Sequence, residues 1–135
     1  MGNVRITIFL FLALGGHAQA AGVPTLPVDQ ARVFATCAGR FSALVSHNYL
    51  FDGAAAEAAE ARRDGFADLL DATLPDALDA GLPETQAMAW RVEAKAAQAY
   101  LLSRATFHED TRAAEAAEKA AKQALTSCEM LLLGA

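Results

Sequence analysis

The sequence predicts an all-α protein, a small up-down-up-down four-helix bundle clamped by one disulfide bond between the first and last helices. Alanine accounts for 33 of the 135 residues, whereas only nine are glycine and four are proline. Apolar residues recur at three- and four-residue spacing in four separate stretches, and no β-branched alternation appears. Two cysteines lie on the predicted inward faces of the first and last stretches. Together these observations favour a single helical domain over residues 28–135.

Residues 1–20 are predicted to be a cleaved secretory signal peptide. Arg5 is the only positive charge before the apolar run Ile6–Leu14, and Ala18-Gln19-Ala20 places small residues at the cleavage site. The alternative is a membrane anchor, but the run is much shorter than the roughly 20 apolar residues that a span needs. We therefore expect an exported protein, located in a bacterial periplasm, with no membrane span after cleavage.

The first helix is expected after an extended lead-in over residues 21–27, which contains two prolines. It runs from Val28-Asp29 to about Tyr49. Its predicted inward face carries the apolar residues Phe34, Cys37, Ala38, Phe41, Leu44 and Val45. This periodicity is typical of an amphipathic helix.

The second helix is predicted over about 54–73. Asp52-Gly53 marks the turn before it, and Asp52 is suited to cap its amino end. Pro75 and Pro83 then delimit a connector. Within this connector, residues 75–78 are long enough to form one helical turn.

The third helix is predicted over about 84–105, with Pro83-Glu84 in its first turn. The fourth runs to about Leu133 and is expected to stop at Gly134. Its amino end fits a capping box from Thr106 to Glu109, with Asp110 or Thr111 as alternative caps.

Cys37 and Cys128 are predicted to form the disulfide bond, because an even pair of cysteines in an oxidising compartment is typically bridged. The alternative is two buried free thiols. The alanine-rich inner faces predict a thin core that gains little from each buried residue. A long-range bridge would therefore supply a large share of the stability.

The charge balance argues against several classes of function. Without Arg5, ten basic and 16 acidic side chains leave a net charge of −6, with no clustered cations. We therefore expect no nucleic-acid partner. No haem attachment motif, zinc ligand set or catalytic motif is recognisable, so no cofactor, metal site or enzymatic activity is expected.

The candidate interaction residues are Gly39, Arg40, His47, Trp90 and Arg91. Glycine inside a helix costs about 1 kcal/mol relative to alanine, so Gly39 predicts a close backbone contact, either with another helix or with a partner. Arg40 and His47 share one row of the first helix, where an acid on a neighbouring helix or a ligand would satisfy the arginine. Trp90 is either a core residue or, together with the adjacent Arg91, an anchor for an interface.

These features lead to two hypotheses about function. The first is a non-enzymatic periplasmic module that binds an unknown protein partner, as an accessory, inhibitor-like or chaperone-like protein. The alternative is a carrier of a small ligand or cofactor in the bundle interior near Arg40, His47 and Trp90.

Overall fold

The computed structural model describes residues 22–133, and these form four helices. They are α1 (Pro27–Asn48), α2 (Gly53–Asp79), α3 (Gln86–Phe107) and α4 (Thr111–Leu133). The predicted all-α, four-helix fold is confirmed, whereas the predicted signal peptide and the stop at Gly134 lie outside the described residues. None of the four helices has the combination of length and apolarity that crossing a membrane requires.

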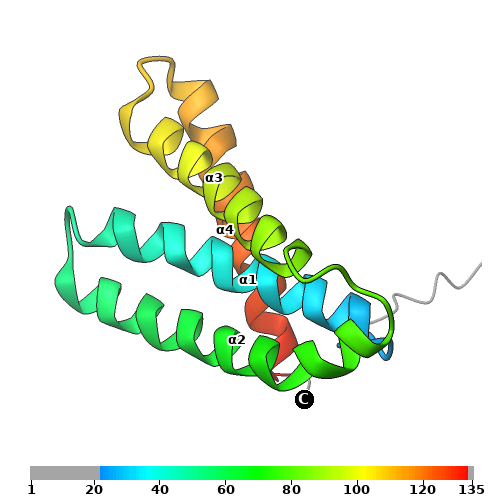
Figure 1. Cartoon of the computed structure of the whole chain (residues 1–135). Coiled ribbons are helices and arrows are strands. Elements are labelled where there is room, and N and C mark those ends of the chain that lie inside the picture. The colour runs from blue at the N-terminus through cyan, green and yellow to red at the C-terminus, as the bar shows by residue number, and fades with distance from the viewer. Residues whose placement is uncertain (1–21, 134–135) are drawn as a thin grey trace, which may run out of the picture.

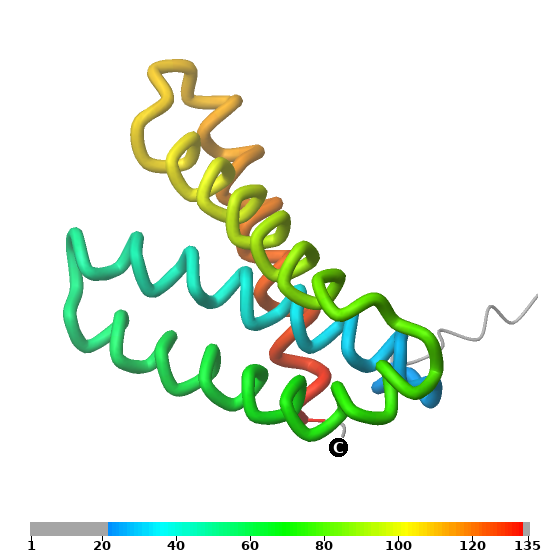
Figure 2. Tube along the Cα trace, viewed as in Figure 1, coloured from blue at the N-terminus to red at the C-terminus, as the bar shows by residue number. Residues whose placement is uncertain are grey.

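The helices are arranged as two antiparallel hairpins that cross each other (Figure 1). Helix α1 is central, because it packs along both α2 and α3, and it meets α4 over a short stretch only. Within residues 22–133, the backbone of α2 does not closely approach that of α3 or α4. Figure 2 shows the consequence, with the two hairpins diverging towards their loops.

The main core lies between α1 and α2 and is built around three phenylalanines. The rings of Phe41 and Phe66 stack with their centroids 5.8 Å apart, and Phe34 lies 6.5 Å from Phe66. Phe41 is 1% exposed and Phe66 fully buried. Alanines surround these rings, so the few large side chains supply most of the apolar area that drives folding.

The predicted end of the second helix is wrong, because α2 continues through Pro75 to Asp79. A proline inside a helix costs about 3 kcal/mol. The added turn buries Ala77 completely and lets the Leu82 amide donate to the Ala77 carbonyl at 3.0 Å. The helix ends at Asp79, and Gly81, two residues beyond that end, has a φ of 97° that suits glycine. Tertiary packing therefore outweighs the local effect of the proline.

The helix caps follow the sequence only in part. Asp52 caps α2 as predicted, accepting from the Ala55 amide at 3.1 Å. Asp110 caps α4, accepting from the Ala113 amide at 2.8 Å. The predicted capping box is wrong, because α3 begins and ends two residues later than expected and Thr106 lies inside it.

The disulfide bond between Cys37 and Cys128 is present and joins α1 to α4. Both cysteines are buried, with exposures of 2% and 0%. This bond adds a covalent link between the two hairpins, which otherwise meet chiefly where α1 packs along α3 and only briefly where α1 meets α4. A second, exposed link is the ion pair between Arg62 of α2 and Glu129 of α4 at 3.1 Å.

Candidate interaction site

Gly39 lies where α1 crosses α3. A Cβ atom at this position would overlap the backbone carbonyl oxygen of Arg91 and would lie 3.1 Å from the Cβ of Ala94. Ala35 and Ala43, one turn away on either side, are also buried. The close contact predicted from Gly39 is therefore with α3 of the same chain, and Arg91 takes part in it through its backbone.

Arg40 reaches across the groove between α1 and α4. Its Nη1 donates to the carbonyl oxygen of Ala124 at 3.0 Å, to Ser127 Oγ at 3.2 Å and to the Cys128 sulfur at 3.5 Å. The side chain is partly buried, and desolvation lowers the pKa of the guanidinium below its usual value. The acidic partner considered from the sequence is absent in the described residues, and neutral acceptors on α4 take its place.

Trp90 is partly buried beneath α1. The guanidinium carbon of Arg32 lies 5.6 Å from the centre of its ring, which is a cation–π contact. Trp90 and Arg40 line a common cavity of about 310 Å³ between α1, α3 and α4. Trp90 therefore contributes to packing and also forms one wall of this cavity.

His47 lies in a different place, near the carboxyl end of α1. Its Nε2 is 3.3 Å from the hydroxyl of Thr106, and its ring lies 5.2 Å from that of Phe51. It lines a separate cavity of about 420 Å³ between α1, α3 and α4. The structure thus brings Arg40 and Trp90 together but does not bring His47 to the same cavity.

Helix α3 also carries an exposed apolar surface that the sequence reasoning missed. We call it the outer stripe of α3, and it comprises Met88, Val92, Ala96, Ala99, Tyr100, Ser103 and Phe107. The four large side chains among these are between 58% and 63% exposed. The seven positions of the stripe recur at spacings of three, four and seven residues, which places them on one side of the helix. This second periodicity was present in the sequence, alongside the inward-facing one.

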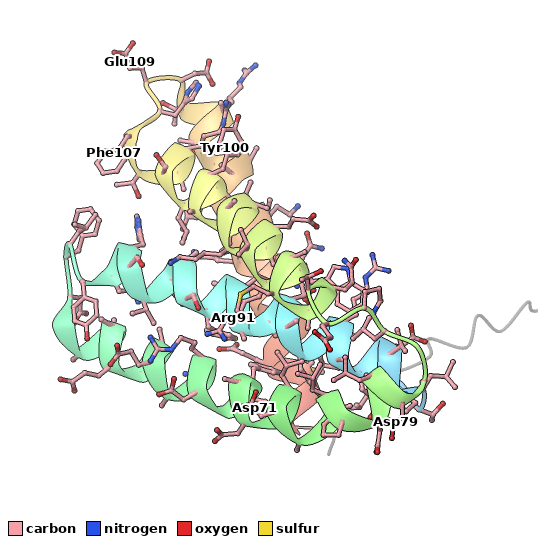
Figure 3. The ribbon with its side chains drawn as sticks, in the orientation of Figure 1. Asp71, Asp79, Arg91, Tyr100, Phe107 and Glu109 are labelled. Carbon is pink, nitrogen blue, oxygen red and sulfur yellow. A yellow bond between two sulfur atoms is a disulfide. The ribbon has the colours of Figure 1, made fainter. Side chains whose placement is uncertain are left out.

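The outer stripe continues beyond α3 onto the loop of the other hairpin. The ring of Phe107 lies 6.4 Å from that of Phe51. Figure 3 shows Phe107 at the end of α3 that faces this loop. Tyr49 and Leu50, next to Phe51, are 57% and 67% exposed. The acidic Glu60 nearby raises the pKa of the Tyr49 phenol.

Helix α3 and helix α2 carry net charges of opposite sign. Helix α3 carries Arg91, Lys95 and Arg104 against one acid, Glu93, a net charge of +2. The guanidinium of Arg104 lies over the ring of Tyr100 at 5.5 Å and donates to its hydroxyl at 3.0 Å. Helix α2 carries seven acids and two arginines, a net charge of −5. The outer stripe therefore lies on the most positively charged of the four helices, in contrast to the acidic α2.

Residues 22–133 contain no group of three or more histidine, cysteine or acidic side chains placed to hold a metal ion. Comparisons with protein families, with curated proteins and with solved structures found no match to this chain.

Proposed function

We propose that this protein is an exported, non-enzymatic interaction module of the periplasm that docks through the outer stripe of α3. Its partner is a different protein that presents an acidic amphipathic helix. The leader-like pattern of residues 1–20 and the buried disulfide support export into an oxidising compartment. The sequence contains no recognisable catalytic motif, which supports a binding role.

The observation that carries the proposal is the exposed apolar area on α3. Aromatic side chains present roughly 150–250 Å² each, so Tyr100 and Phe107 alone contribute on the order of 200 Å² at their observed exposures. Met88 and Val92 enlarge this area to the scale of about 300–600 Å² that the largest apolar patch on a monomer reaches, and such patches are often functional. The pairing of Tyr100 with Arg104 also matches the residue types that are enriched at binding hot spots.

The charge of α3 indicates what kind of partner covers it. Two copies of this helix placed face to face would bring like charges of +2 together, which disfavours a symmetric pairing. A partner helix with leucines on one face and acids along its borders would complement both the stripe and its cations. We therefore assign the surface to a different, acidic protein.

The test uses two methionines of equal exposure on different helices. Met88 in the outer stripe is 61% exposed and Met130 on α4 is 59% exposed. Wild-type, Met88→Glu and Met130→Glu chains are immobilised as baits for periplasmic extract, and retained proteins are identified by mass spectrometry. We expect the wild-type bait to capture one partner that has an acidic amphipathic helix. The captured amount of this partner should fall at least tenfold on the Met88→Glu bait and should be unchanged on the Met130→Glu bait.

Three outcomes would contradict the proposal. Equal loss on both variants would mean that the stripe is not the docking surface. A concentration-dependent dimer in sedimentation, abolished by Met88→Glu, would assign the stripe to a second copy. A captured partner that presents a basic helix would overturn the charge argument. Circular dichroism of each variant controls for folding.

A further inference from the structure

A row of polar side chains on α1 lines a groove that the outer stripe does not include. Arg32, Thr36 and Arg40 follow one another at four-residue spacing and so lie on one side of the helix. All three line both the cavity of about 310 Å³ beside Trp90 and an adjoining cavity of about 400 Å³. Such volumes lie at the lower end of the range for small-molecule sites.

Neither arginine in this groove forms an ion pair with an acidic side chain of the described residues. The four ion pairs in residues 22–133 involve Arg62, Arg63 and Lys122, so neither Arg32 nor Arg40 has an acidic side-chain partner there. The one acid on the groove wall, Glu93, is exposed and outside ion-pair distance of both.

The hydrogen bonds of Arg40 leave much of its donor capacity unused. All three of its protein acceptors are neutral and are reached by Nη1 alone, so Nε and Nη2 have no acceptor among the described residues. A guanidinium has five N–H donors arranged as a fork that matches the two oxygens of a carboxylate or phosphate. A partly buried cation without a counter-charge is costly, and a bound anion would relieve that cost.

The rest of the groove is suited to a small organic anion. Arg32 is held over the ring of Trp90, which places its charge beside a flat apolar wall. Gln98 is 1% exposed and already donates to the Ala121 carbonyl at 3.2 Å, so it forms a fixed part of the floor. Arg32 and Arg40 lie about 12 Å apart along the helix axis, a span that two long side chains can close around one ligand.

We propose that this groove between α1, α3 and α4 binds a small carboxylate- or phosphate-bearing molecule. Arg40 and Arg32 contact the oxyanion, and Trp90 covers the apolar part of the ligand. The site is independent of the protein docking surface, because it uses the side of α3 that faces α1 and α4.

The test uses Trp90 as a reporter, because it is the only tryptophan in the chain. The mature protein is titrated with benzoate, inorganic phosphate and uncharged benzamide, and Trp90 fluorescence and heat are recorded. We expect saturable binding of at least one of the two anions and none of benzamide. Benzoate binding identifies a carboxylate site, and binding of phosphate alone identifies a phosphate site.

The variants separate a specific site from general charge attraction. Arg32→Gln removes an exposed guanidinium that makes no hydrogen bond to the described residues, so this variant should fold. Its affinity for the anion should be about tenfold lower than that of the wild-type protein. Arg112→Gln on α4 makes the same change in net charge and should leave affinity within about twofold. Arg40→Gln should abolish anion binding. If the Arg40→Gln variant does not fold, the Arg32→Gln variant decides the outcome. Absence of saturable anion binding, binding of benzamide, or equal losses with Arg32→Gln and Arg112→Gln would overturn the proposal.

Discussion

Helices α1 and α3 have the same length of 22 residues, and at least half of the residues in each are apolar, yet the two helices are buried very differently. Nine residues of α1 are buried, compared with only Ala87 and Gln98 of α3. Helix α1 lies between α2 and α3, whereas both neighbours of α3 lie on its inner side. The difference shows that apolar content alone does not determine burial. A second apolar face on α3 is left uncovered because nothing in residues 22–133 packs on it.

The disulfide bond should have the largest effect on this arrangement. By the chain-entropy model, a bridge between residues 91 apart contributes about 4.5 kcal/mol. We expect Cys37→Ala/Cys128→Ala to lower the free energy of unfolding by about that amount, measured by urea denaturation. Amide exchange should accelerate more in α3 and α4 than in α2, because α2 keeps its aromatic core with α1. Uniform acceleration over all four helices would show that the hairpins unfold as one unit.

A pair of aromatic truncations tests the contrast between the core and the outer stripe. Phe41→Ala removes a stacked, buried ring and should lower the free energy of unfolding by about 4 kcal/mol. Tyr100→Ala removes a ring that is 60% exposed and should change it by less than about 0.5 kcal/mol. Thermal denaturation of both variants measures the difference. A large loss for Tyr100→Ala would mean that the stripe contributes to the fold of the single chain.

Two glycine substitutions should have smaller effects than the loss of the disulfide bond or of the Phe41 ring, and the two effects should have opposite signs. Gly39→Ala would force α1 and α3 apart at the Arg91 carbonyl and should destabilise by about 2 kcal/mol. Gly65→Ala, within α2, meets no atom within 4 Å and should stabilise by about 0.5–1 kcal/mol through better helix propensity. Urea denaturation of both variants checks the signs. Equal effects would show that helix propensity, and not the crossing with α3, explains Gly39.

The sequence predicted the fold well because periodicity and cysteine placement record which residues face inward. The four helices, the Cys37–Cys128 bond and the Asp52 cap are all confirmed. Pro75 misled the prediction because its local cost is outweighed by the burial of Ala77, which no local pattern reveals.

The candidate site was less predictable, for physical reasons that differ from residue to residue. Gly39 was identified correctly as a point of close contact, because a glycine inside a helix leaves a signal in the sequence. Arg40 bonds to a backbone carbonyl of α4, and backbone acceptors have no sequence signature. The outer stripe was missed because periodicity shows which residues share a face of α3, but not which faces the other helices cover.

The position of the disulfide bond also determines how the domain responds to mechanical force. Cys37 lies in the first half of α1, and Cys128 lies in the last turns of α4. Tension applied to the two ends of the chain therefore passes directly from α1 to α4 through two sulfur atoms. The segment between the cysteines, including the outer stripe of α3 and most of the core, carries none of that load. Pulling can therefore lengthen the oxidised chain only outside residues 37–128.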